Sequence, residues 1–245
     1  KEFVIYSEGK NYRNYYYQIV ETLTKNFNKK ITYISSEKDD FISNSNVKNI
    51  YVGSSYIRTI FFAFLSCEKI LLTLTDLGNS YLKKSKFCKN YIYIFHSPIS
   101  THIGYKKNAF SNYDTILCNG DYQINEIREA EEKYNFIKKK LVKTGYLYFD
   151  FLKSIHEESK ENSKNTIIIA PTWVNKGKNL FDDYSVQIIE KLLKGNFKVI
   201  FRPHPQHFLI RKKKIKLIKE KYKNSTNFFM EESVNSFQNI EKSNL

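Results

Sequence analysis

The sequence predicts an α/β protein made of two domains, of which the second is incomplete. Short runs of β-branched and aromatic residues alternate with longer amphipathic stretches, which is typical of parallel βαβ units. One entirely polar segment, Glu157–Asn165, interrupts this alternation. The alternation then resumes, but it reaches only three strands before the chain ends. We therefore expect an N-terminal domain over residues 1–156, a linker over 157–165 and a truncated C-terminal domain over 166–245.

Strands are expected in the first domain wherever a short apolar run is bounded by polar or turn residues. They are Phe3–Tyr6, Ile31–Ile34, Asn49–Val52, Ile70–Thr73, Tyr91–Phe95, Thr115–Cys118 and Leu141–Thr144. Helix-like stretches lie between several of them, at Tyr12–Lys25, Ser55–Ser66 and Tyr122–Tyr134. After the last strand a Gly145-Tyr146 turn leads into an expected helix over Asp150–His156.

The second domain is expected to contain half of a doubly wound sheet. In chain order its elements are strand Thr166–Ala170, helix Tyr184–Lys194, strand Phe197–Phe201, helix Phe208–Tyr222 and strand Asn227–Met230. The last residues, Ile240–Leu245, resemble the beginning of a further strand. The fold expected for the whole chain is thus two Rossmann-like domains.

The chain carries a formal net charge of +15, which favours anionic partners such as phosphates, nucleotides or an anionic membrane surface. It has neither zinc-finger spacing nor an RNP-type aromatic pattern, so nucleic acid is not an expected partner. The run Arg211–Lys219 lies on an expected helix whose apolar face would include Ile210, Leu217 and Ile218. Its lysines either form a solvated face or attract anionic lipid or acidic polymer.

Cysteine usage and the absence of targeting signals favour the cytoplasm. Cys67, Cys88 and Cys118 lie in or beside apolar segments without metal-ligand spacing, so we expect buried reduced thiols. The first residues, Lys1–Tyr6, are typical of a strand rather than of a signal peptide, and Ile60–Leu77 is too polar for a membrane span. Peripheral binding at the inner face of the cell membrane is compatible with this location.

Three expected strands end in a proline-containing turn that carries polar or aromatic side chains. His96 follows the first, Thr172 and Trp173 follow the second, and Arg202 and His204 follow the third. Because Pro203 and Pro205 fix φ and lack an N–H group, we expect a stiff turn at His204 that neither continues as a strand nor bends into a helix. Ligands of open α/β sheets bind at the carboxyl ends of strands, so a site is expected at these turns.

The histidines define what such a site could do. One of His96 and His204 could take a proton from an acceptor hydroxyl, since imidazole titrates near neutral pH. The other, together with Arg202, could stabilise charge on a phosphoryl or leaving group, and helix N-termini could hold a pyrophosphate. His102 is a third candidate that could equally cap or pack within its turn. His156 and His207 are expected to be surface residues without a role.

Several enzyme classes lack their motif in this chain. There is no glycine-rich phosphate loop, because Gly177 is isolated, and this argues against an NTPase or a dinucleotide-binding enzyme. No Gly-x-Ser-x-Gly elbow and no cluster with metal-ligand spacing occurs. We therefore expect no cofactor and no metal site.

Two motifs about 30 residues apart resemble those of the CDP-glycerol glycerophosphotransferases, the family of teichoic-acid polymerases and their capsule-synthesis relatives. Ala170-Pro171-Thr172-Trp173 is similar to the family's Ala-Pro-Thr-Trp, and Arg202-Pro203-His204-Pro205 to its Arg-x-His-Pro. Three further segments are more weakly similar to the family. Phe95-His96-Ser97 aligns with its Trp-His-Gly motif, and Gly145–Asp150 with its Gly-x-x-x-x-Asp segment. Tyr113–Cys118 is similar to the family's strand that leads toward that segment.

The resemblance implies a GT-B fold with the active site between the two domains. It implies that His96 and His204 are the catalytic pair, and that Ser97, Gly145, Thr172, Trp173 and Arg202 bind substrate or nucleotide. A CDP-linked donor and a glycan or lipid-linked acceptor would be the partners.

The chain also departs from the family. Ser97 stands in place of the usual glycine and Phe95 in place of tryptophan, so the donor or acceptor can differ from glycerol phosphate. The chain stops before the Thr-Asp-x-Ser strand end that binds the donor nucleotide in the family.

Three hypotheses remain open at this point. The first is transfer of a glycerol-phosphate or related polyol-phosphate unit from a CDP-linked donor to a surface polymer, with release of CMP. The second is a GT-B glycosyltransferase that uses a nucleotide sugar in capsule or lipopolysaccharide synthesis. The third is a basic scaffold without catalysis that binds anionic polymer or membrane.

Overall fold

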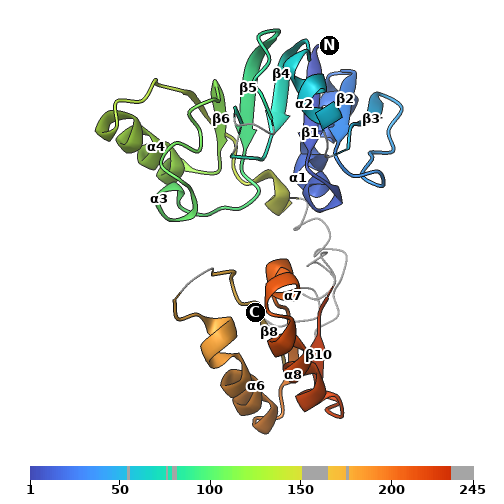
Figure 1. Ribbon diagram of the computed structural model, residues 1–245, viewed down its shortest axis with the longest axis vertical. Helices are drawn as coiled ribbons and strands as arrows, with labels where there is room; N and C mark the ends of the chain where they lie inside the picture. Colours follow the sequence, from blue (N-terminus) through green and yellow to red (C-terminus); the bar gives the residue numbers. More distant parts are fainter. Residues whose placement is uncertain (54–55, 76, 79–81, 151–164, 175–176, 233–245) are drawn as a thin grey trace. The chain divides into compact units, whose positions relative to one another are not determined.

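The computed structural model describes residues 1–53, 56–75, 77–78, 82–150, 165–174 and 177–232. The chain divides into two compact units, Lys1–Lys153 and Ser154–Leu245. Nearly all of the expected helix Asp150–His156, the linker up to residue 164 and the expected strand beginning at Ile240–Leu245 lie outside the described residues (Figure 1).

The described part of the first unit contains one fully parallel sheet in the order β3-β2-β1-β4-β5-β6-β7 (Figure 1). The strands are β1 (Phe3–Ser7), β2 (Ile31–Ser35), β3 (Val47–Tyr51), β4 (Cys67–Leu72), β5 (Cys88–Ile94), β6 (Thr115–Cys118) and β7 (Lys140–Lys143). The chain starts in the middle of the sheet, builds one side with β2 and β3, and then crosses back to β4. This reversal of direction is the doubly wound order that the βαβ alternation predicts.

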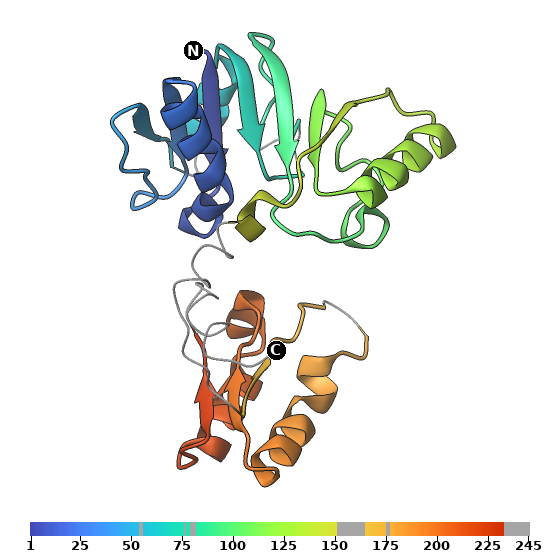
Figure 2. The ribbon, with the colours of Figure 1, turned by 180° about the vertical axis from the view of Figure 1, so that it is seen from behind.

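Helices cover both faces of this sheet. They are α1 (Lys10–Glu21), which continues as η1 (Thr22–Asn26), α2 (Tyr56–Ala63), the short α3 (Thr101–Gly104) and α4 (Asp121–Lys133). Alternate residues of β1 belong to different cores, Ile5 with Tyr16 of α1, and Val4 with Phe62 of α2 and Ile127 of α4. Since successive side chains of a strand point to opposite faces, α1 covers one face, and α2 and α4 the other (Figures 1 and 2).

The described part of the second unit has the same kind of parallel sheet with helices, but it is smaller. Its described sheet has the parallel order β10-β9-β8, with β8 (Thr166–Ile169), β9 (Lys198–Phe201) and β10 (Phe228–Met230). The helical elements are η2 (Leu180–Tyr184), α6 (Ser185–Lys194), α7 (Pro205–Ile210) and α8 (Lys212–Tyr222). Their buried residues, among them Phe181, Ile189 and Ile218, form one core with the strands. The prediction of two Rossmann-like domains is therefore confirmed.

Two expectations about this unit are wrong. The prolines around His204 do not prevent a helix, because Pro205 is the first residue of α7, where a missing N–H group costs nothing. The expected single helix Phe208–Tyr222 is two helices, α7 and α8, which meet at Arg211. With α8 starting at Lys212, its buried face consists of Ile215, Ile218 and Tyr222.

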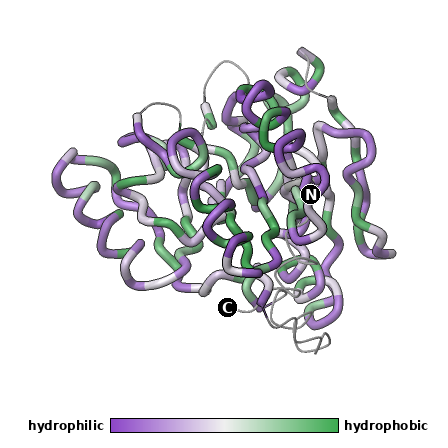
Figure 3. The backbone as a smooth tube through the Cα atoms, turned by 90° about the horizontal axis from the view of Figure 1, so that it is seen from below, coloured by the Kyte–Doolittle hydropathy of each residue, from purple (hydrophilic) through white to green (hydrophobic). Residues whose placement is uncertain are grey.

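The apolar face expected from sequence is therefore displaced. Ile210 and Leu217 are more than half exposed, at 54% and 56%. Figure 3 shows the helices alternating between hydrophilic and hydrophobic residues along their length, as expected where one side of a helix faces a core. Lys212, Lys213 and Lys216 lie on the exposed part of α8.

The three cysteines are free and buried, as predicted. Cys67 of β4 is the register partner of Cys88 on β5, and its thiol donates to the Cys88 sulfur at 3.1 Å. That hydrogen bond and burial raise the pKa of Cys67. In the described part of the chain no helix is long and apolar enough to cross a membrane.

Candidate functional site

His96 lies directly beyond the carboxyl end of β5 and is surrounded by tyrosines. Its ring packs edge-to-face against the rings of Tyr12 and Tyr15 on α1, with centroids 6.0 Å away in each case. Its backbone carbonyl accepts a hydrogen bond from the Tyr146 hydroxyl at 2.9 Å. Tyr148 completes this group, because its ring contacts Tyr15 at 4.7 Å.

The parallel sheet explains why residues so far apart in sequence meet. β1 leads into α1, β5 ends next to His96, and β7 leads into the segment from Gly145, so all three carboxyl ends lie at one edge of the sheet. The structure therefore brings His96 and the Gly145 segment together. The sequence did not single out Tyr12 and Tyr15, because α1 contains four tyrosines and only the order of the strands brings two of them to His96.

The environment of His96 keeps its ring neutral. Burial lowers the pKa of His96, and within the described residues its Nδ1 atom is enclosed and has no hydrogen-bond partner. Burial, with the nearby Glu8 and Tyr15, raises the pKa of Tyr12 to about 12. The site thus contains a neutral imidazole beside a protonated phenol, and a neutral imidazole can accept a proton.

Ser97 and Gly145 shape the backbone around His96. The Ser97 carbonyl accepts a hydrogen bond from the Asn119 side-chain amide at 3.4 Å. Gly145 has φ of 75°, and a Cβ atom there would have no neighbour within 4 Å. The left-handed turn after β7 therefore explains why position 145 is a glycine, whereas close packing does not.

In the second unit, His204 is the N-cap residue of α7, just beyond the carboxyl end of β9. Its Nδ1 accepts a hydrogen bond from the Gln206 N–H at 3.2 Å. Because Nδ1 is an acceptor, the proton of the neutral ring is on Nε2. Burial and the neighbouring Arg202 lower the pKa of His204, so this tautomer prevails at neutral pH. His204 consequently presents Nε2–H as a hydrogen-bond donor.

His207 fixes the backbone of His204 through a hydrogen bond. The expectation that His207 is a surface residue without a role is wrong. It is 1% exposed and its ring stacks on Phe181 at 3.9 Å. Its Nδ1 accepts the His204 N–H at 3.1 Å, so the two histidines form a reciprocal capping box. Their spacing of three residues, with proline between them, is the signal that could have identified this pair.

Thr172 and Trp173 follow β8 and differ in their surroundings. Thr172 is exposed. Trp173 packs edge-to-face on the His207 ring at 5.3 Å, and the Arg211 guanidinium lies 5.8 Å from its ring centroid. The structure therefore connects Trp173 to His204 through His207, within one unit.

His102, the third histidine candidate, is exposed on α3 and is held by α4. Its Nε2 bonds to the Glu126 carbonyl at 3.2 Å and lies 3.7 Å from the Glu129 carboxylate. These contacts correspond to the packing alternative. Nowhere in the described ranges do three or more metal-ligating side chains gather into a group that could hold a metal.

No protein-family model and no curated protein matches the chain. Solved structures do. The wall teichoic acid polymerase TagF is 17% identical with a TM-score of 0.59, and the match covers 98% of this chain and 62% of the polymerase. A histidine-to-asparagine variant of TagF soaked with CDPG gives the same values. The UDP-GlcNAc 2-epimerase of Methanocaldococcus jannaschii is 11% identical with a TM-score of 0.53, over 98% of this chain and 75% of the epimerase.

The fold is of the GT-B type. The chain spans less than two thirds of the polymerase's length. At these identities the likeness concerns the fold, and the chemistry has to be argued from the residues of this chain.

The capping box predicts that His207 stabilises the second unit in a pH-dependent way. Burial and His204 lower the pKa of His207 to about 4, against an ordinary value of about 6.5. The folded state favours the neutral ring, so this contribution is fully present above pH 6.5 and is lost as the pH falls toward 4. We expect the wild type to lose about 2–3 kcal/mol of unfolding free energy between pH 7.5 and 4.5 from this residue alone.

Two variants separate the roles of His207. His207→Gln keeps an acceptor for the His204 N–H, since glutamine is an ordinary capping-box residue, and removes the titration. His207→Phe leaves that N–H without an acceptor and should cost about 1–3 kcal/mol at pH 7.5. Urea unfolding followed by the fluorescence of Trp173, the one tryptophan of the chain, measures both. Equal pH dependence in wild type and His207→Gln would contradict the assignment.

Proposed function

We propose that this protein is a GT-B-type transferase that moves a glycerol-phosphate or related polyol-phosphate unit from a CDP-linked donor to a cell-surface polymer. The observation that carries the proposal is the geometry of His204, an Nε2–H donor fixed at the carboxyl end of β9 within Arg202-Pro203-His204-Pro205. The motif Ala170-Pro171-Thr172-Trp173 supports it, as does the fold shared with TagF, whose histidine-to-asparagine variant was soaked with CDPG.

In this proposal His96 is the general base. Because its Nδ1 is enclosed, a substrate can approach the ring only from the Nε2 side. The proposal requires the tautomer with the ring proton on Nδ1, in which Nε2 takes the proton of the acceptor hydroxyl as the oxygen attacks the β-phosphorus of the donor. The new P–O bond joins the polyol phosphate to the acceptor, the bond from this phosphorus to the bridging oxygen breaks, and CMP leaves with the electron pair.

His204 and Arg202 act on the charge that this step develops. The Nε2–H of His204 donates to a phosphoryl or leaving-group oxygen, and the Arg202 guanidinium adds positive charge. Ser97, Gly145, Thr172 and Trp173 are proposed to bind substrate or nucleotide. The acceptor is proposed to be a glycan or lipid-linked chain, and the place of action the cytoplasm. The exposed lysines of α8 favour the anionic inner face of the membrane there.

Nucleotide release from defined donors tests the function. We expect the full-length protein to release CMP from CDP-glycerol when a polyol-phosphate-primed acceptor is present. Release of a nucleoside diphosphate from a nucleotide sugar, with CDP-glycerol inert, would replace this proposal by glycosyl transfer. Retention of an anionic polymer without turnover of either donor would replace it by a binding role.

A further inference from the structure

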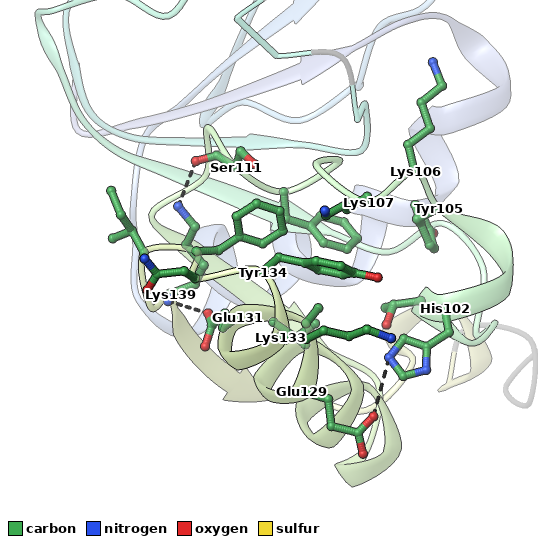
Figure 4. Close-up of a pocket in the computed structure, with 17 residues that line it drawn as sticks. His102, Tyr105, Lys106, Lys107, Ser111, Glu129, Glu131, Lys133, Tyr134 and Lys139 are labelled. Carbon is green, nitrogen blue, oxygen red and sulfur yellow. Dashed lines mark hydrogen bonds and ion pairs between the residues drawn. The ribbon is translucent and has the colours of Figure 1, made fainter.

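The first unit contains a pocket between α4 with the residues that follow it and the segment that runs from α3 to Ser111 (Figure 4). Its volume is about 560 Å³, which lies in the range of pockets for small ligands. His96, Ser97 and Gly145 are not among the residues that line it. The pocket is therefore distinct from the candidate transfer site.

Aromatic side chains form the floor and walls of the pocket. Ile127 belongs to the main core of the unit, and Tyr105 and Phe110, with ring centroids 5.2 Å apart, pack against that core. Tyr134 and Phe136 form a second aromatic pair at 5.7 Å on the other side. Such a surface accommodates an alkyl or aromatic group.

The rim of the pocket is cationic. Lys107 and Lys133 flank the Tyr134 ring, with their Nζ atoms 3.6 Å and 5.6 Å from its centroid (Figure 4). Lys106 and Lys139 also line the pocket, but the Lys139 Nζ donates to the Ser111 carbonyl at 2.8 Å and the Lys106 side chain points away from the cavity (Figure 4).

The acidic side chains of the pocket already have partners. Glu131 is buried, forms an ion pair with Arg128 and accepts the Lys139 N–H at 2.7 Å. Glu129 lies 3.7 Å from His102. Lys107 and Lys133 therefore leave an excess of positive charge beside an apolar floor.

We propose that this pocket binds a small amphiphilic anion, with its alkyl or aromatic group against the tyrosines and phenylalanines and its phosphate group at Lys107 and Lys133. Positive charge at the rim selects the anionic head, and the aromatic walls select the apolar part. A neutral apolar ligand would not use the lysines, and a free phosphate would not use the floor. The proposal does not depend on the transfer reaction, because binding is measured directly.

Isothermal titration calorimetry on the full-length protein tests this with three probes below their micellar concentrations. Octyl phosphate has both chemical parts, octyl glucoside lacks the charge, and inorganic phosphate lacks the chain. We expect octyl phosphate to bind at least about tenfold more tightly than either of the others. No binding of octyl phosphate, or equal binding of octyl glucoside, overturns the proposal.

Variants locate the site. Ala130→Phe fills the pocket from α4 without changing its charge, and Lys107→Gln with Lys133→Gln removes the head-group contacts. Each change should weaken octyl phosphate binding by at least about tenfold, whereas Lys138→Gln, an exposed lysine outside the lining, should leave it unchanged. If Ala130→Phe fails to fold, the double lysine variant decides. An equal loss in Lys138→Gln would show attraction to the basic surface in general and would overturn the assignment.

Discussion

The His96→Gln variant of the full-length protein is expected to transfer about 10²–10⁴-fold more slowly than the wild type, the range that a positioned general base contributes. Glutamine keeps a polar side chain at the end of β5 but has no nitrogen that takes a proton near neutral pH. The rate of CMP release at saturating donor and acceptor measures the effect. The melting temperature of the variant shows whether the tyrosine packing around position 96 survives.

The pH profile distinguishes a base from a residue that only supports the structure. Burial lowers the pKa of His96, so its ring stays neutral below the ordinary value of about 6.5. Wild-type transfer should therefore be level through neutral pH and fall only as the pH drops through the lowered pKa. The variant should lack this acidic limb. An unchanged profile, or a rate within about twofold of wild type, would contradict the base role.

The positions of the strand ends were predictable from sequence because local signals determine them. Apolar runs followed by proline place His96, Thr172 and His204 at the ends of strands, and the structure has a strand ending before each. Parallel pairing then places β-strand carboxyl ends at one edge of a sheet. The roles of His96 and His204 in transfer remain predictions.

The contacts that shape the site could not be predicted because they join distant segments. Tyr12 and Tyr15 reach His96 only because β1 and β5 both flank β4, and nothing near residue 96 encodes that order. His207 is buried by Phe181, which η2 supplies from 26 positions earlier in the chain. The interior position of His207 is thus a tertiary property that the lysine-rich neighbourhood in sequence conceals.

The break at Arg211 shows how a small local event changes a prediction about a surface. A continuous helix would have placed Ile210 and Ile218 on one face. The backbone of Arg211 leaves helical geometry, with φ −109° and ψ 34°, and its guanidinium donates to Asp182 at 3.2 Å. α8 therefore starts anew at Lys212, and Ile215, Ile218 and Tyr222 are its residues that reach the core.

The His204 variants are expected to separate capping from catalysis, because the two nitrogens of its ring have different tasks. His204→Asn keeps an acceptor for the Gln206 N–H, since asparagine is a preferred N-cap residue, but removes the distal donor. It should retain the wild-type melting temperature and transfer about 10²–10³-fold more slowly. His204→Ala loses both functions. The loss of its cap should lower the free energy of unfolding by about 0.5–2 kcal/mol relative to His204→Asn.

His204→Gln is the converse variant. Its amide N–H reaches the position of Nε2, whereas its longer side chain is a poorer N-cap, so it should be less stable than His204→Asn and more active. This crossed pattern would identify the catalytic nitrogen as a donor whose direction the cap determines. If the asparagine variant transfers at the wild-type rate, or is no slower than the glutamine variant, the donor role is contradicted. In that case the hydrogen bond from Gln206 would serve only to start α7, and the charge developed on the donor phosphate would have to be met by Arg202.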